Sequence, residues 1–252
     1  MTRSGAYIIC TSPRSGSTLL CSLLRATGAA GHPDSWFHDP SLQGWAANLG
    51  VAPGAATGRA LILSLIEAAT RHGCAGGSLF ALRLQRQSAP FFLETLRTLH
   101  PDAASDTARL QRCFGPTRFI HLTRRDKIEQ AISHEIARQS GLWHRAADGS
   151  ELERLAPHRT PAYDRAALQA QIRTFAAHDR DWCAWFDREG IAPLRLSYDD
   201  LADDPDATLR RVLAHLGLDA DLAHGVRPGV RKLADATNRI WKERYLKDSA
   251  PG

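Results

Sequence analysis

Short apolar runs alternate with stretches of helical periodicity along most of this chain. The apolar runs predict strands over residues 6–10, 78–84, 118–123 and 191–198. Apolar positions spaced three and four apart predict helices over residues 19–28, 61–69, 91–99, 126–139, 168–190 and 205–216. Strands that alternate with helices favour an α/β fold of three layers, with a mostly parallel central sheet covered by helices.

Two segments lack this periodicity. Residues 44–58 are rich in Gly, Ala and Pro and predict an irregular connection. Residues 141–163 contain Trp143 and His144 but no repeating pattern over most of their length. Long unpatterned segments in compact domains tend to be lids or binding loops, so we expect this second segment to cover a bound acceptor.

The junction between the first predicted strand and the first helix has the sequence Ser-Pro-Arg-Ser-Gly-Ser-Thr, at residues 12–18. A tight strand-to-helix turn directs free backbone N–H groups and the positive end of the helix dipole at one point, which suits a phosphate. Small residues let the backbone approach a ligand closely, and Arg14 adds a positive charge. An ordinary Ser/Gly turn is the alternative interpretation of these residues.

This loop differs from the ATP-binding P-loop in two defining residues. Ser17 stands where that motif has lysine, and the first glycine of the motif is absent. A nucleotide triphosphatase also needs an acidic residue for Mg²⁺ near the end of a neighbouring strand, whereas the predicted strand 118–123 is followed by Arg124. The pattern favours a nucleotide with phosphates at two places and no metal, and a metal-dependent P-loop kinase is the competing hypothesis.

Composition sets bounds on the kind of protein. The chain has 252 residues, enough for one sizeable α/β domain, and its 32 Lys and Arg against 27 Asp and Glu give a net charge of +5. This excess suits an anionic ligand but is too mild for nucleic acid. The 5 cysteines are dispersed and predict neither a disulfide framework nor a zinc site. We find no signal-peptide pattern and no apolar stretch of membrane-spanning length, so we expect a cytoplasmic protein.

Four sequence motifs occur in order over nearly the whole chain. The first is Ser-x-Arg-Ser-Gly-Ser-Thr-Leu-Leu at residues 12–20, and the second is Arg-x-Asp-x-x-x-Gln-Ala-x-Ser at residues 124–133. The third is Trp-x-x-Trp-Phe at residues 182–186, followed by Tyr-x-x-Leu, and the fourth ends in Trp-x-x-Arg-Tyr at residues 241–245. This ordered set resembles the bacterial trehalose 2-sulfotransferase family, a group that also includes sulfotransferases acting on lipopolysaccharide and Nod factor.

The resemblance implies a P-loop-like α/β fold and a single sulfotransferase domain over residues 1–252. Its donor would be 3′-phosphoadenosine 5′-phosphosulfate (PAPS), without a metal, and its acceptor a hydroxyl group of a small molecule, a glycan or a glycolipid. The resemblance also implies a cradle for the 5′-phosphosulfate formed by Arg14, Ser15, Gly16, Ser17 and Thr18. Members of the group commonly pair, so a homodimer is a further expectation.

The resemblance assigns roles to several other residues. Arg124 and Ser133 would hold the 3′-phosphate, and Lys232 would help to close the site over the donor. Arg83 falls where the family has a lysine and would contact the transferring sulfuryl group. A salt-bridged arginine at position 83 is the alternative, because a cation in an apolar run needs either an anionic partner or water.

One departure from the family concerns the general base. The family places a glutamate after a Gly-x-Pro loop, and the matching residue here is Ser35, which is not a useful base at neutral pH. His32, Asp34 and His38 are the nearby titratable residues, so each is a candidate for that role. A nucleotide-binding relative that has lost catalysis is the alternative function.

Overall fold

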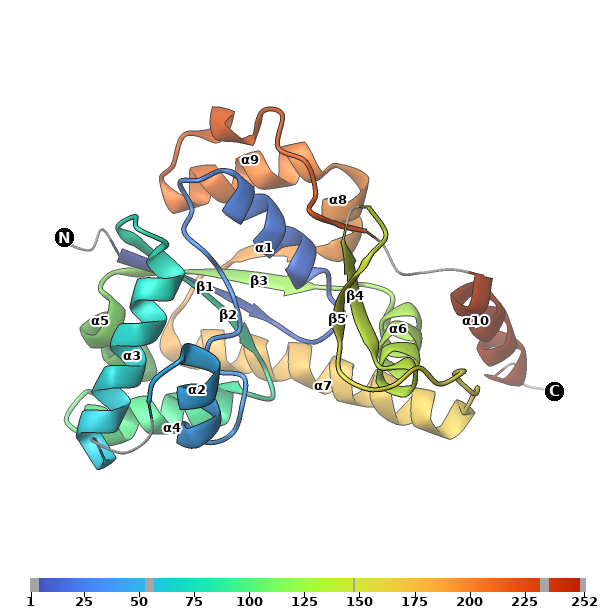
Figure 1. Ribbon diagram of the computed structural model, residues 1–252, viewed down its shortest axis with the longest axis horizontal. Helices are drawn as coiled ribbons and strands as arrows, with labels where there is room; N and C mark the ends of the chain where they lie inside the picture. The colour runs from blue at the N-terminus through green and yellow to red at the C-terminus, as the bar shows by residue number, and fades with distance from the viewer. Residues whose placement is uncertain (1–4, 53–56, 147, 232–235, 250–252) are drawn as a thin grey trace.

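A four-stranded parallel sheet forms the centre of the molecule (Figure 1). The computed structural model describes residues 5–52, 57–146, 148–231 and 236–249. The strand order is β2-β1-β3-β6, from β2 (Leu79–Gln85), β1 (Gly5–Thr11), β3 (Thr117–Thr123) and β6 (Leu194–Ser197). Because all the pairings are parallel, the carboxyl ends of these strands meet at one edge of the sheet.

Helices cover both faces of this sheet and complete the three layers expected from the sequence. One face packs against α1 (Ser17–Ala26), α8 (Tyr198–Asp203), α9 (Pro205–Leu216) and the short 3₁₀ helix η1 (Ala220–Ala223). The other face packs against α2 (Leu42–Leu49), α3 (Gly58–Cys74), α4 (Ala89–Leu99), α5 (Asp106–Phe114) and α7 (Arg165–Glu189). The prediction of an α/β fold with a mostly parallel sheet is confirmed.

The central strand β1 shows why its sequence is continuously apolar. All of its residues are buried, and successive side chains alternate between the two faces of the sheet. Ile8 and Cys10 belong to the core beneath α3 and α4, whereas Tyr7 and Ile9 belong to the core beneath α1 and α9. The sequence of a strand with both faces buried is therefore a continuous apolar run rather than an alternation of apolar and polar residues.

A smaller core forms beside the central sheet. There α6 (Lys127–Ser140) packs on α7, and α10 (Ala236–Ser249) packs on α6. Ala131 and Ile132 of α6 meet Leu168 of α7 and Trp241 of α10. This cluster holds the chain just after β3 in place at the carboxyl edge of the sheet (Figure 1).

The segment 141–163 contains strands that the sequence did not predict. A second sheet has the order β5-β4-β7 and is antiparallel, with β4 (Leu142–Ala146), β5 (Glu151–Arg154) and β7 (Val230–Arg231). The register between β4 and β5 shifts twice, and their side chains are exposed or half-buried. No clean alternation of apolar and polar residues can arise under these conditions, which is why the pattern gave no strand.

Other boundaries differ from the sequence expectations in smaller ways. Helix α2 begins just before the segment expected to be irregular and occupies its first six residues, 44–49, and its first turn is capped by Ser41, whose side chain accepts a hydrogen bond from the Gly44 N–H at 3.0 Å. The sequence did not predict helix α5, because only three of its nine residues are buried and so few apolar positions form no clear helical pattern. Within the described parts of the chain, no helix is both long and apolar enough to cross a membrane.

Candidate active site

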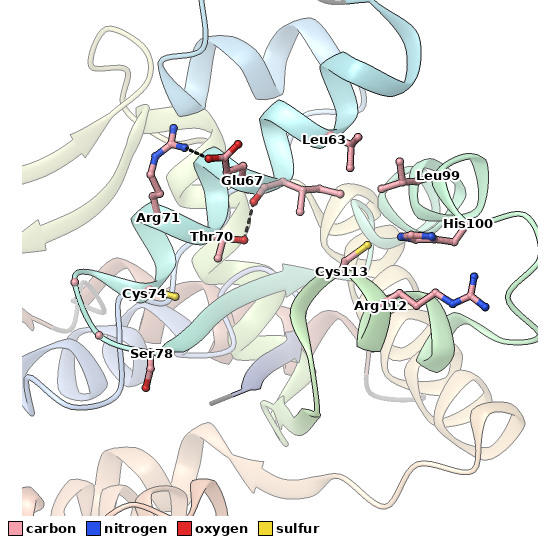
Figure 2. Close-up of a pocket in the computed structure, with 13 residues that line it drawn as sticks. Leu63, Glu67, Thr70, Arg71, Cys74, Ser78, Leu99, His100, Arg112 and Cys113 are labelled. Carbon is pink, nitrogen blue, oxygen red and sulfur yellow. Dashed lines mark hydrogen bonds and ion pairs between the residues drawn. The ribbon is translucent and has the colours of Figure 1, made fainter. Parts of the chain in front are cut away.

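A cavity of about 420 Å³ lies at the carboxyl edge of the central sheet. The loop after β1, Arg83 of β2, Arg124 after β3 and the β4–β5 hairpin all contribute to its lining. A larger cavity of about 820 Å³ is lined by α3, α5 and residues 76–78, which precede β2 and so lie at the amino end of that strand (Figure 2). Open parallel sheets bind ligands outside the carboxyl ends of their strands, so we take the smaller cavity as the candidate site.

The start of α1 presents unused backbone donors to this cavity. Gly16 is the N-cap residue with φ of +85°, and no side chain among the described residues caps the helix there. The first-turn N–H groups of Ser17 and Thr18 therefore face the cavity at the positive end of the helix dipole. A Cβ atom at position 16 would overlap the ring of Tyr198, so the loop and α8 approach each other at a distance that glycine alone allows.

Hydrogen bonds inside the loop fix its shape. The Ser15 hydroxyl is fully buried, donates to the Ser12 carbonyl at 2.8 Å and pairs with the Thr11 hydroxyl. The buried Gln130 of α6 donates to the Ser12 hydroxyl at 3.0 Å and to the Pro13 carbonyl at 2.7 Å. The Ser15 side chain is therefore occupied within the loop, and the residue can offer a ligand its backbone N–H.

Arg14 links the loop to the rest of the site. The residue has φ of +62°, which is uncommon for a residue with a side chain. Its Nε donates to the Ser133 hydroxyl of α6 at 3.0 Å, and its NH1 donates to the Trp143 carbonyl of β4 at 2.6 Å. Burial, assisted by the neighbouring Arg124 charge, lowers the pKa of Arg14 to about 10. Arg14 and Ser133, which the sequence assigned to different phosphates, thus contact each other directly.

Arg124 supplies a second cation, which is buried. Arg124 is 6% exposed, and its guanidinium lies 4.7 Å from the centre of the Tyr198 ring. Its NH2 donates to Glu129 at 2.7 Å, whereas its buried Nε has no hydrogen-bond partner among the described residues. A buried donor without a partner costs free energy, so this Nε is a reason to expect a ligand oxygen nearby.

Arg83 connects the loop at residues 34–35 to the start of α1 through hydrogen bonds. Its Nε donates to the Ser35 hydroxyl at 2.8 Å, its NH1 to the Thr18 hydroxyl at 3.0 Å and its NH2 to Asp34 at 3.0 Å. Strand pairing sets this geometry, because Asp34 forms a parallel bridge with Leu82 next to Arg83. The salt-bridged arginine expected as the alternative is present, and the same side chain also lines the cavity.

The base candidates from the sequence lie at different places. His38 is exposed and lines the cavity, with its Nδ1 at 3.1 Å from the Ser35 carbonyl. Asp34 is held by Arg83, as above. His32 lies outside the lining, edge-on to Trp36 with ring centres 5.5 Å apart, and burial lowers its pKa. Lys232 lies outside the described residues.

Two further cavity residues come from the hairpin. His144 of β4 places its Nε2 at 3.1 Å from the Thr18 hydroxyl and at 3.4 Å from the Glu153 carboxylate of β5. Burial, followed by the charges of Arg14 and Arg83, lowers the pKa of His144 to about 3. The sequence signalled His144 only as part of an unpatterned segment, and nothing in it singled out Glu153.

Fold and site together define an α/β protein with a cationic loop at the carboxyl edge of a parallel sheet. The profile of the Stf0 sulphotransferase family matches residues 6–248, so the chain belongs to this family and is a sulfotransferase. The resemblance noted in the four motifs is thereby confirmed. Among the residues that the structure describes, no group of three or more His, Cys, Asp or Glu is arranged to hold a metal ion.

Individual relatives agree with this assignment. The trehalose 2-sulfotransferase of Mycolicibacterium smegmatis is 28% identical over 271 residues, covering 97% of this chain and 95% of the relative. The trehalose 2-sulfotransferase of Mycobacterium tuberculosis is 28% identical over 272 residues, covering 95% and 93%. Among solved structures, the sulfotransferase domain of the Synechococcus PCC 7002 olefin synthase aligns with a TM-score of 0.41 and 16% identity, over 100% of this chain and 91% of that one.

Proposed function

We propose that this protein transfers a sulfuryl group from PAPS to a hydroxyl group of a carbohydrate or glycolipid. The observation that carries the proposal is that one cavity combines the uncapped start of α1 with two arginines, the half-buried Arg14 and the buried Arg124. PAPS has anionic groups at both ends of its ribose, and a site with two cationic places suits such a ligand. The relatives named for trehalose sulfation support a carbohydrate acceptor.

The 5′-phosphosulfate would bind at the phosphate loop. Ser17 and Thr18 of the first turn of α1 line the cavity at the positive end of the helix dipole, and Arg14 supplies the charge. Gly16 keeps the backbone close to the ligand, since a side chain there would meet Tyr198. Ser15 and Ser17, both buried, would contribute through their backbone.

The 3′-phosphate would bind between Arg124 and Ser133. The unpartnered Nε of Arg124 is a donor ready for a phosphate oxygen, and Ser133 lies on the same side of α6 as Gln130, which holds the loop. Arg124 remains paired with Glu129 through its NH2, so the ligand would use a different edge of the guanidinium.

During transfer, negative charge grows on the oxygens around the sulfur. Arg83 donates through NH1 to Thr18 and lies beside the loop, so its charge acts on this region together with that of Arg14. Both side chains are held by several hydrogen bonds before any ligand arrives, and such preorganised donors need no rearrangement at the moment of reaction. Neither arginine can take a proton from the acceptor, because both are already charged.

The test uses ³⁵S-labelled PAPS with trehalose and a panel of glycans and glycolipids. We expect label to appear in at least one acceptor, and no transfer from adenosine 5′-phosphosulfate at the same concentration, since that donor lacks the 3′-phosphate. Binding of 3′,5′-ADP should be tighter than binding of 5′-AMP. Binding of 3′,5′-ADP without transfer to any acceptor would instead identify a nucleotide-binding relative that has lost catalysis, the alternative suggested by Ser35.

A further inference from the structure

Sulfuryl transfer to a hydroxyl group requires a proton acceptor, and the arginines of the cavity cannot serve. Ser35 is held as an acceptor of a hydrogen bond from Arg83 and is not basic at neutral pH. The group must lie on the cavity wall near the phosphate loop, because the hydroxyl that attacks the sulfur loses its proton there. Of the cavity-lining histidines, His144 contacts the loop itself, through Thr18.

The hydrogen bonds around Thr18 orient the lone pair of His144. A guanidinium group can only donate, so Arg83 NH1 uses a lone pair of the Thr18 hydroxyl at 3.0 Å. The hydroxyl proton is then free to be donated to His144 Nε2 at 3.1 Å in the tautomer that carries its proton on Nδ1, which is the tautomer that a general base needs. An acceptor hydroxyl that enters the cavity can replace Thr18 as the donor to the same nitrogen.

We propose that His144 is the general base of this sulfotransferase and that Glu153 is the residue that positions it, an inference that rests on the proposed function. As the acceptor oxygen forms its bond to sulfur, the hydroxyl proton passes to His144 Nε2. The bond between sulfur and the bridging oxygen breaks at the same time, and its electron pair leaves on the phosphate of 3′,5′-ADP. The Glu153 carboxylate, 3.4 Å from Nε2, then faces the imidazolium that has formed.

Because of the charges that face His144, the basicity of its ring depends on whether the donor is bound. Arg14 from the loop and Arg83 from β2 are cations, whereas Asp34 beside β2 and Glu153 of β5 are anions. Burial and the two arginines lower the pKa of His144 to about 3, so its ring is neutral before the donor binds. A bound phosphosulfate offsets the two positive charges, and the basicity of the ring rises when it is needed.

His144→Gln tests the role in catalysis, and His158→Gln, at an exposed position outside the cavity lining, is the control. His38 also lines the cavity, but its ring bonds to the backbone of its own loop, so His38→Gln tests the competing candidate. With labelled PAPS and trehalose, we expect His144→Gln to lower kcat at least about 100-fold, the usual scale of general-base catalysis, while 3′,5′-ADP affinity stays within about threefold. His158→Gln should retain the kcat of the wild type. A His144→Gln enzyme with more than a third of wild-type kcat overturns the proposal, as does loss of activity confined to His38→Gln.

Glu153→Gln tests the positioning role through the pH profile of kcat. The neutral ring is the active form, so activity falls on the acid side as His144 becomes protonated. Removing the negative charge of Glu153 makes protonation harder, and we expect the acid limb to move to lower pH while kcat on the plateau decreases several-fold. An acid limb at the wild-type position would show that Glu153 does not act on the titrating group.

A binding measurement separates failure of this inference from failure of the proposed function. The ¹⁵N signals of His144 can be followed by NMR against pH, with and without 3′,5′-ADP, and no acceptor is needed. We expect the titration midpoint to rise when 3′,5′-ADP binds, and an unchanged midpoint overturns the proposal for His144. If the wild-type protein transfers sulfate to no acceptor, the proposed function fails instead, whatever the variants do.

Discussion

Gly16 is the residue at which loop shape and ligand approach are most tightly linked. Its φ of +85° lies in the left-handed region, and its Cα faces the ring of Tyr198. We expect Gly16→Ala to lower the free energy of unfolding by more than the backbone cost of about 1 to 2 kcal/mol and to weaken binding of 3′,5′-ADP at least tenfold. Urea denaturation and isothermal titration calorimetry measure the two effects.

Gly28 provides the matched control for that substitution. It also has a positive φ, +69°, but a Cβ atom there would meet nothing within 4 Å. Gly28→Ala should therefore carry the backbone cost alone and leave 3′,5′-ADP binding unchanged. Equal losses of affinity in the two variants would mean that the Tyr198 contact does not shape the loop.

Single residues also show how far a sequence defines a site. Arg83 could be selected because a cation within an apolar run is unusual and needs a reason. Arg14 could be selected by its place in the strand-to-helix loop, and Arg124 by its place at the end of a predicted strand. Glu153 could not, because a glutamate among exposed residues is the ordinary case. The Ser15 hydroxyl looked available in the sequence, yet the structure uses it inside the loop. Whether a polar side chain faces a ligand or its own backbone depends on contacts that spacing does not reveal.

Among the elements, strands buried on both faces were the easiest to predict. Strand β1 carries a continuous apolar run because it is covered on two sides, and the buried centre of β3 is apolar except for His121. The hairpin of β4 and β5 was missed because it borders the cavity and has no second apolar face to bury. It is held by polar contacts instead, among them the donation from Arg14 to the Trp143 carbonyl at 2.6 Å. Elements that form a site thus carried a weaker signal than elements that form the core.

Helix α10 is tied to α6 at the residues that support the Arg124 pocket. Lys242 of α10 donates to Asp126 and Glu129 at 2.7 Å each, and Glu129 also pairs with Arg124 at 2.7 Å. The hydrogen bond from Lys242 is the main cause that lowers the pKa of Glu129. Since these groups are partly exposed, the ion pairs themselves add at most about 1 kcal/mol to stability.

We expect Lys242→Met to affect donor binding more than stability. Without Lys242, the Glu129 carboxylate has Arg124 as its remaining cation and competes with the 3′-phosphate for it. Affinity for 3′,5′-ADP should fall about threefold to tenfold, whereas affinity for 5′-AMP should change little; both are measured by calorimetry. Lys247→Met, at an exposed position of the same helix, is the control. A parallel loss for both nucleotides would argue that α10 acts on the whole cavity rather than on the 3′-phosphate.

At the scale of the whole molecule, buried neutral histidines connect stability with pH. Burial lowers the pKa of His121 in β3 to about 4, with a contribution from Arg195, and lowers the pKa of His134 to about 4. In the unfolded chain the pKa of these rings is about 6.5. Between these values the unfolded chain binds more protons than the native protein, so the free energy of unfolding falls as the pH decreases from about 6.5 towards 4.

His121→Gln should make the protein less sensitive to acid. His121 is 3% exposed and accepts a hydrogen bond from Arg195 at 3.2 Å, so its ring cannot be protonated in place without cost. Between pH 7 and pH 5, proton uptake by this one ring in the unfolded chain lowers the free energy of unfolding by about 2 kcal/mol. We therefore expect the loss of unfolding free energy over that interval to be smaller by about 1 to 2 kcal/mol in the variant than in the wild type. Urea denaturation at the two pH values provides the comparison, and His158→Gln, at an exposed position, is the control.

The interval from pH 7 to pH 5 isolates the histidines from carboxylates with a lowered pKa, such as Glu129 and Glu135. These carboxylates lose their contribution to the free energy of unfolding only as the pH falls below their ordinary pKa of about 4.5. An equal loss in the His121 variant and the wild type would show that this ring binds a proton as readily in the native protein as in the unfolded chain.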